Sequence, residues 1–247
     1  PIHASTQMTI HTPEGALWAK EHGISRVVVS RELSRKEIAA ICKTGIEVET
    51  FVHGALCMSV SGQCGLSAMI GSRSANRGRC AQACRLPFSA KGDKNGCALS
   101  LKDLCLVPYV AELAEDGVAS LKIEGRCKRP EYVAAAVTAL VQARAGETPD
   151  LDTLRAVFSR SGFTDGYYTG KRQQMFGTRQ KDDVLQGQKV LPQLAQLYQK
   201  PTPQVPLDMH VTVQTGQPAV LKLRDGDGIS VSVSGDVVQP ARTKATD

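Results

Sequence analysis

Ile24-Ser-Arg-Val-Val-Val-Ser30 is the stretch that decides the fold of this chain. Its three consecutive valines are typical of a parallel strand whose two faces are both covered. Strand-like segments also begin at Ile2 and Ile46, and helix-like segments fill both intervals. A strand that recurs at a regular interval with a helix in between predicts the βα units of a parallel sheet or barrel.

Helix-start signals support this interpretation. Thr12-Pro13 has the pattern of an N-cap followed by proline at the first helical position, and this helix is predicted to end near Gly23. Ser34 and Glu37 form a capping box that opens a second helix. The N-terminal part of the chain is therefore predicted to hold two complete βα units before a third strand.

The next strand is predicted only at Val118 to Ile123, after a long excursion. A helix near Asp103 to Glu115 is expected before it, and a helix from Pro130 to Ala145 after it. A closed (β/α)8 barrel needs eight units and roughly 250 residues, so four units predict an α/β fold with an incomplete TIM-type barrel. Because the chain opens on Pro1 in a strand-like segment, the other strands are expected upstream.

Three parts are predicted along the chain. Residues 1–146 would be the C-terminal half of a barrel with a cysteine-rich insertion at 53–100, and residues 147–200 a helical and irregular extension. Residues 201–247 would be a small β domain that continues beyond the end of the chain. Its alternating apolar and polar residues, with an Asp-Gly-Asp-Gly turn at 225–228, predict antiparallel strands at 207–213, 219–223 and 229–233.

The composition is that of a globular protein, with 42% hydrophobic and 22% charged residues. No apolar run approaches the roughly 18 residues that a membrane span needs, and the start lacks the features of a secretory signal. We therefore expect a cytoplasmic protein with no membrane partner. In that reducing compartment its eight cysteines would serve metal binding or burial rather than disulfides.

Four cysteines share one segment, with the spacing Cys57-x6-Cys64-x15-Cys80-x3-Cys84. Four thiolates suit zinc or an iron-sulfur cluster. Zinc sites more often use two close pairs, so the spacing favours a cluster, with buried reduced thiols as the alternative. The other cysteines are expected in the core or in incidental positions, the first two being reserve ligands: Cys97, Cys105, Cys42 and Cys127.

Positive charge gathers in the same segment. The chain carries a formal charge of +6, and between His53 and Cys97 only Asp93 is acidic. The basic residues of this stretch are Arg73, Arg77, Arg79, Arg85, Lys91 and Lys94. Cationic side chains here would offset the negative charge of a thiolate-ligated cluster or bind the phosphates of an anionic partner.

Polar residues also stand at the predicted strand ends, where βα barrels carry their active sites. They are Ser5, Thr6 and Gln7 after the first strand, His53 at the end of the third, and Lys122, Glu124 and Arg126 at the fourth. Glu124 with Lys122 suits acid-base work, with a salt bridge at the barrel rim as the alternative. His53 suits proton donation, with a packed core histidine as the alternative.

The sequence contains neither a Gly-x-Ser-x-Gly nucleophile elbow nor a His-Glu-x-x-His zinc motif. It therefore shows no recognisable catalytic residues for hydrolysis.

Longer segments are similar to those of a known family. They are ETFVHGALCMSVSGQC at 49–64, NRGRCAQACR at 76–85, SLKDLC at 100–105 and LKIEGR at 121–126. Together with the Ser5-Thr6-Gln7 strand end, they make residues 1–175 resemble the collagenase-like peptidase family U32. Despite its name, that family includes oxygen-independent hydroxylases of transfer RNA, ribosomal RNA and ubiquinone precursors that carry 4Fe-4S clusters.

The resemblance implies a cluster on Cys57, Cys64, Cys80 and Cys84, and iron-sulfur assembly proteins as partners. The chain from Gln188 onward resembles the branch that hydroxylates a cytidine of large-subunit ribosomal RNA, which implies RNA as substrate and prephenate as hydroxyl donor. Glu124, Lys122 and His53 would then position the donor. The residues that would bind RNA are Ser5, Gln7, Arg73, Arg77, Arg79, Arg85 and Arg126.

Two alternatives stay open at this point. One is a peptidase acting on collagen-like substrates, as the family name states. The other is hydroxylation of tRNA or of a ubiquinone precursor. Aromatic residues make up only 4% of the chain, so stacking platforms for single-stranded RNA are scarce, although a base could still be extruded into a pocket.

Overall fold

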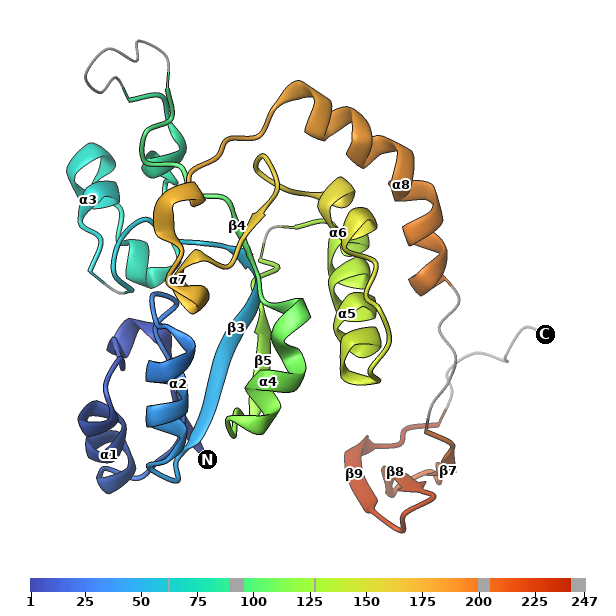
Figure 1. Cartoon of the computed structure of the whole chain (residues 1–247). Coiled ribbons are helices and arrows are strands. Elements are labelled where there is room, and N and C mark those ends of the chain that lie inside the picture. The colour runs from blue at the N-terminus through green and yellow to red at the C-terminus, as the bar shows by residue number, and fades with distance from the viewer. Residues whose placement is uncertain (62, 89–95, 127, 200–204, 241–247) are drawn as a thin grey trace. The chain divides into compact units, whose positions relative to one another are not determined.

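The fold is that of a computed structural model, which describes residues 1–61, 63–88, 96–126, 128–199 and 205–240 (Figure 1). The chain divides into two compact units, Pro1–Tyr198 and Gln199–Asp247. Each unit is described by itself. No helix among the described residues is both long enough and apolar enough to cross a membrane.

Four parallel strands form the framework of the first unit. They are β1 (Ile2–Ala4), β2 (Ile24–Val28), β3 (Glu47–Ala55) and β5 (Ser120–Ile123). Each pairs with the next in this order, and the register places Val27 beside Val48 and Thr50 beside Leu121. These are the four strands predicted from the sequence, so the parallel βα repeat is confirmed.

The predicted helix starts are confirmed as well. In α1 (Pro13–Glu21), the hydroxyl of Thr12 accepts a hydrogen bond from the backbone N–H of Gly15 at 3.2 Å. In α2 (Arg35–Cys42), the backbone N–H of Ser34 donates to the Glu37 carboxylate at 2.7 Å, completing the capping box. Helix α5 (Pro130–Arg144) begins with proline and follows β5 as expected.

The segment before β5 differs from the prediction. Helix α4 begins only at Val110 and ends at Glu115, whereas Asp103–Cys105 form strand β4. Strand β4 runs antiparallel to the end of β3, with Cys105 beside His53, and pairs in parallel with the short strand β6 (Phe163–Thr164). All three residues of β4 are buried, and hydrogen bonding to β3 satisfies their backbone in a way that a surface helix could not.

The described strands of the first unit therefore form one mixed sheet in which parallel pairs dominate. The α/β class is confirmed, while the incomplete barrel stays a prediction. The remaining helices of this unit are α3 (Leu66–Gly71), α6 (Leu151–Val157), α7 (Gly166–Thr169) and α8 (Lys181–Gln199). Short 3-10 turns occur at Thr6–Met8, Ala75–Arg77, Ala83–Arg85, Val107–Tyr109 and Arg172–Gln174. Figure 1 shows α3 and the adjoining cysteine-bearing segment at the end of the sheet opposite the N-terminus.

The core explains the sequence of β2. Val27, Val28 and Val29 are each at most 3% exposed, so both faces of this strand are covered, as its β-branched run predicted. Full burial of a valine stabilises the fold by about 1.5 to 3 kcal/mol relative to exposure. A second buried cluster, which includes Tyr132 and Leu154, packs α5 against α6.

The second unit is a small antiparallel sheet, as predicted. Its strands β7 (Leu207–Thr212), β8 (Pro218–Asp225) and β9 (Ser230–Val237) pair in chain order. The predicted turn between β8 and β9 is confirmed, because the Asp225 carboxylate accepts hydrogen bonds from the backbone N–H groups of Asp227 and Ile229. Residues 201–204 and 241–247 of the predicted β domain lie outside the described residues.

A glycine controls how closely β3 approaches the end of β5. Gly54 has a φ of 123°, and a Cβ atom at this position would lie 2.5 Å from the carbonyl oxygen of Glu124. Real Cβ atoms essentially never come so near to a backbone atom. Only glycine therefore permits this approach, which brings the backbone after β5 against the end of β3.

Replacing Gly54 by alanine should destabilise the protein by about 2 to 4 kcal/mol, because a steric clash adds to the strained backbone angle. Gly146→Ala is the matched control, since Gly146 has a φ of 78° but no atom within 4 Å of the added Cβ. The control should lose only about 1 kcal/mol. Urea unfolding followed by circular dichroism measures both, and equal losses would contradict the tight approach of β3 to Glu124.

Candidate functional site

The candidate site lies where the parallel strands end. Ser5 follows β1, Arg31 comes shortly after β2, Cys57 comes shortly after β3, and Glu124 directly follows β5. The carboxyl ends of neighbouring parallel strands open at one edge of a sheet, where α/β proteins bind their ligands. The sheet topology thus brings together residues that are far apart in the sequence.

Arg31 occupies the centre of this edge. Its side chain is only 14% exposed, its Cζ lies 3.9 Å above the centre of the Phe51 ring, and Nη2 is 3.7 Å from Oε2 of Glu124. Its Nε is buried without a hydrogen-bond partner among the described residues. Burial lowers the pKa of the guanidinium, while Glu124 and the Cys57 thiol oppose that shift. Arg31 is therefore a mostly buried cation that faces both a carboxylate and a thiol.

Glu124 sits at the rim of the same site, with 30% of its side chain exposed. Its backbone N–H donates to the carbonyl of His53 at 2.8 Å, which continues the pairing of β3 with β5. Its carboxylate accepts a hydrogen bond from the backbone N–H of Arg126 at 3.2 Å. The predicted partner of Glu124 was Lys122, but the structure pairs it with Arg31.

Lys122 instead pairs with Glu49, and the distance from Nζ to Oε1 is 2.7 Å. The hydroxyl of Ser120 donates to the other carboxylate oxygen of Glu49 at 3.1 Å. Burial raises the pKa of Glu49, but the bonds from Lys122 and Ser120 outweigh it and the pKa is lowered overall. The amine of Lys122 thus takes part in an ion pair on the sheet with Glu49, so neither the acid-base pair nor the rim salt bridge that the sequence suggested for Lys122 and Glu124 is formed.

His53 lies in the core rather than at the surface of the site. It is fully buried, and its ring packs 5.4 Å from Tyr132 and 5.3 Å from Phe163, measured between ring centres. Neither ring nitrogen has a hydrogen-bond partner among the described side chains. Burial lowers the pKa of His53 to about 4, so its ring is neutral at pH 7. This is the packed histidine that the sequence left open as the alternative to a proton donor.

The Cys57 thiol lies within electrostatic range of two other predicted ligands, Cys84 and Cys64. Burial raises the pKa of the Cys57 thiol above its ordinary value, and the neighbouring Cys84 and Cys64 raise it further. Cys80 is exposed, and its sulfur accepts a hydrogen bond from the backbone N–H of Gln82 at 3.3 Å. The Ser67 hydroxyl lies 4.0 Å from the same sulfur, so Cys80 lies against α3, the helix that follows Cys64.

All the cysteines that the structure describes are free thiols. Of the others, Cys105 is buried in β4, whereas Cys42 and Cys97 are half-buried. Cys127 lies outside the described residues.

Arg85 places a second guanidinium beside the thiols. It donates hydrogen bonds to the carbonyl of Leu56, the hydroxyl of Ser100 and the carbonyl of Leu101. Burial lowers its pKa most and the charge of Arg160 adds to the lowering, while Cys84, Asp103 and Cys57 oppose that shift. Within the described ranges it forms no direct ion pair with a carboxylate, so its charge is balanced by neutral acceptors, by Asp103 at longer range and by the nearby thiols.

The donor set and the charges fit an iron-sulfur cluster. Thiolates are soft ligands for iron, and the mostly buried Arg31 and the half-buried Arg85 would offset the negative charge that a cluster and its thiolates bring. In the part of the chain that the structure describes, however, no three His, Cys, Asp or Glu side chains are arranged as a metal site. Cys57, Cys64, Cys80 and Cys84 would therefore be drawn together by ligation, as is common where metal binding and folding are coupled.

The predicted RNA-binding residues lie around the same segment. Ser5 donates to the side-chain carbonyl of Gln7, and the amide of Gln7 donates to the backbone carbonyl of Asn76 at 3.1 Å, which ties the end of β1 to the cysteine-bearing segment. Arg126 reaches that segment from β5, with Nη2 3.3 Å from the carbonyl of Gly78. The other arginines of this set besides Arg85 are exposed: Arg73, Arg77 and Arg79.

A cavity of about 410 Å³ is lined by residues of α3 and of the segments on either side of this helix, including Cys64 and Arg73. It gives solvent and small groups access to one predicted ligand. Lys91, Asp93 and Lys94, which belong to the same basic stretch, lie outside the described residues.

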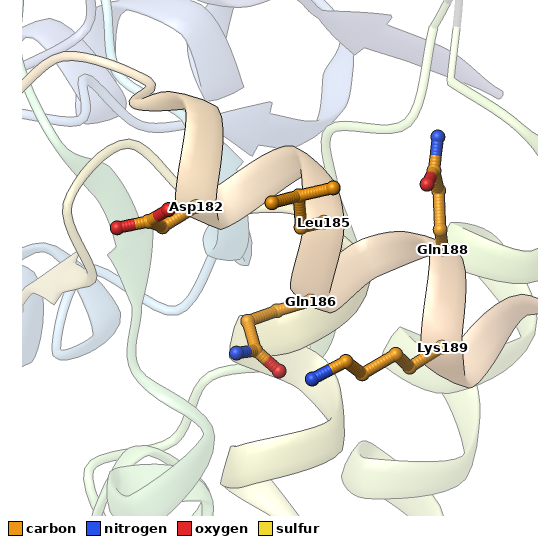
Figure 2. A pocket seen from close by; sticks show the side chains of 5 residues that line it. All are labelled: Asp182, Leu185, Gln186, Gln188 and Lys189. Carbon is orange, nitrogen blue, oxygen red and sulfur yellow. The ribbon is translucent and has the colours of Figure 1, made fainter.

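A hollow of about 380 Å³ on α8 is not a candidate active site. Figure 2 shows its lining side chains, all of which come from this one helix: Asp182, Leu185, Gln186, Gln188 and Lys189. Gln186 and Lys189 extend to one side and Gln188 to the other, so the side chains do not converge on a common point. Among the described residues, no other element contributes to the lining.

Sequence reasoning missed Arg31, the most buried cation of the site. It stands just after the valine run of β2. The candidate residues after the other strands were selected for this same position at a strand end, so the sequence also carried a signal for Arg31.

Comparison with known proteins shows which sequences this chain is similar to. Residues 1–176 match the model of a family described as Peptidase family U32. The chain is 44% identical over 139 residues to the 23S rRNA 5-hydroxycytidine C2501 synthase of Escherichia coli, covering 53% of this chain and 21% of that protein.

Two further relatives carry different names. The tRNA hydroxylation protein P1 of Bacillus subtilis is 39% identical over 150 residues, covering 56% of this chain and 36% of that protein. A protein named collagenase in Porphyromonas gingivalis is 35% identical over 201 residues, covering 69% of this chain and 48% of that protein. The chain thus spans from about a fifth to half of the length of these relatives. No solved structure gives a significant match.

Replacing Lys122 by methionine should reduce the free energy of unfolding at pH 7 by about 1 kcal/mol, since the amine is 40% exposed and water screens its ion pair. The folded-state pKa of Glu49 lies below its unfolded value, so this contribution is present above about pH 4.3 and is lost as the pH falls through the lower folded value. Urea unfolding at several pH values should therefore show the difference from wild type shrinking below pH 4. Lys36→Met, on the exposed side of α2, is the control and should change stability little at either pH. A loss that does not vary with pH would contradict the ion pair.

Proposed function

The chain belongs to peptidase family U32, and on that premise we propose that it is part of an iron-sulfur enzyme that hydroxylates RNA without oxygen. The observation that carries the proposal is that the Cys57 thiol lies within electrostatic range of Cys64 and Cys84 and of the cation Arg31, and that the half-buried Arg85 is influenced by Cys57 and Cys84. The names of two relatives, a 23S rRNA 5-hydroxycytidine synthase and a tRNA hydroxylation protein, support RNA as the substrate class.

The proposed cofactor is a 4Fe-4S cluster on Cys57, Cys64, Cys80 and Cys84. Such a cluster supplies one-electron redox chemistry when bound. Arg31 and Arg85 would lower the cost of placing its negative charge in a partly buried site. Because burial raises the pKa of the Cys57 thiol, that thiol is protonated at pH 7 in the absence of a metal and would lose its proton on ligation.

The proposed substrate is a cytidine of large-subunit ribosomal RNA. Arg73, Arg77 and Arg79 are exposed around the cysteine-bearing segment, where they can contact phosphates without loss of other ion pairs among the described residues. Each phosphate contact releases counterions, so RNA binding would weaken steeply as salt is added. Ser5 and Gln7, next to this segment, would contact the RNA through hydrogen bonds.

Prephenate is the proposed hydroxyl donor, on the resemblance to the family alone. Of the residues first assigned to position it, Glu124 is the one at the rim of the site, where it faces Arg31. Lys122 is held by Glu49, and His53 is inaccessible in the core. The positioning role therefore falls to Glu124, with Arg31 as its partner.

A peptidase is the second candidate function, because relatives in Porphyromonas gingivalis are named collagenase. The described residues near the thiols do not form a catalytic pair for this candidate. His53, the histidine nearest to the thiols in sequence, has no hydrogen-bond partner among the described side chains and is not paired with a nucleophile. Release of peptides from gelatin by metal-free protein would favour this candidate over RNA hydroxylation.

Deleting the full-length gene should abolish 5-hydroxycytidine in 23S ribosomal RNA, as measured by mass spectrometry of nuclease digests. A plasmid carrying the wild-type gene should restore the modification, whereas Cys57→Ser should not, because it removes a proposed ligand. Cys42→Ser, in α2, is the matched control and should restore it. Unchanged hydroxycytidine in the deletion strain would reject the proposal. Loss of hydroxylated nucleosides from tRNA alone would reject the ribosomal substrate and favour tRNA.

A further inference from the structure

A second group of cations surrounds one aromatic ring in the first unit. Lys128 places its Nζ 3.0 Å from the centre of the Phe158 ring, and the Cζ atoms of Arg179 and Arg160 lie 4.2 Å and 5.0 Å from the same centre. These three side chains come from the loop before α5, the segment before α8 and the loop after α6. The fold has therefore gathered three positive charges from separate segments.

Among the described residues, one carboxylate faces this group. Asp103, on β4, is 1% exposed, and its Oδ1 lies 2.5 Å from Nη1 of Arg160. Its Oδ2 is buried and has no hydrogen-bond partner among the described residues. A single carboxylate cannot balance three cations, so the group keeps an excess of positive charge in a partly buried place. Such an arrangement is costly unless an anion completes it.

Electrostatic interactions within the group agree with this geometry. Burial lowers the pKa of Lys128 to about 8, and the charges of Arg160, Arg179 and Arg85 contribute to the lowering, while Asp103 opposes it. Arg85 belongs to this set and also interacts with the Cys84 and Cys57 thiols. The cations around Phe158 thus adjoin the thiol-bearing site through Arg85.

We propose that Lys128, Arg160 and Arg179, with Arg85 beside them, form a binding site for a small carboxylate or phosphate anion. Two observations favour a small anion over the backbone of an RNA chain. The side chain of Arg160 is only 12% exposed and that of Asp103 only 1%, so the centre of the group is recessed. Arg179 is exposed and stands at the rim, where a free anion can enter. The inference does not depend on the reaction proposed above.

The test measures binding of malonate, inorganic phosphate and the neutral analogue malonamide to the full-length protein by calorimetry at constant ionic strength. Malonate or phosphate should bind to the wild type and malonamide should not. Lys128→Met and Arg179→Gln should each weaken binding about 5- to 10-fold, since each removes one charge-assisted contact. Arg144→Gln, an exposed arginine at the end of α5, should change it less than twofold.

Circular dichroism and thermal melting would show whether each variant folds, and the exposed position of Arg179 makes Arg179→Gln the decisive variant if Lys128→Met is unstable. No binding of malonate or phosphate at 10 mM, or binding that both variants leave unchanged, would overturn the inference. If a single-stranded RNA oligonucleotide binds and loses affinity in both variants while the small anions do not bind, the group contacts RNA and the small-anion site is wrong.

Discussion

Two guanidinium groups, one mostly buried and one half-buried, are the constraint on which the rest of the site depends. Arg31 lies over Phe51 with the carboxylates of Glu124 and Glu32 near it, and Arg85 is held by two carbonyls and a hydroxyl, with Asp103 in electrostatic range but no direct ion pair among the described residues. A partly buried cation is costly unless enough negative charge lies nearby, and neutral thiols add none. Thiolates that ligate a metal would add it. The arrangement is therefore understandable if the thiols work as ligands and not as core residues.

The parallel framework was predictable because its signals are local. A valine run, a proline after an N-cap and a capping box each act within a few residues, and β2, α1 and α2 appear where these signals place them. Strand β4 was not predictable in this way. Asp103–Cys105 become a strand because the end of β3 offers unpaired backbone groups to them, and that partner lies far away in the sequence.

The position of the site was predictable from the sequence, but the ion pairs and hydrogen bonds between its side chains were not. Strand ends correctly indicated where polar groups would gather, yet the register between β3 and β5 decides which groups meet. Lys122 lies opposite Phe51 and Ser120 opposite Glu49, which brings Lys122 and Ser120 to the Glu49 carboxylate and leaves Glu124 to Arg31. The burial of His53 likewise depends on contacts between distant segments, because β4 and α5 cover the end of β3.

The most direct test of the account is the iron and acid-labile sulfide content of the full-length protein purified without oxygen, together with its visible absorption. The account predicts a brown protein with iron and sulfide in equal amounts, both lost in Cys57→Ser and in Cys64→Ser but retained in Cys42→Ser. It also predicts that Arg85→Met weakens cluster retention, because the positive charge beside Cys57 and Cys84 is removed. A colourless wild-type protein that holds zinc and no sulfide would contradict it.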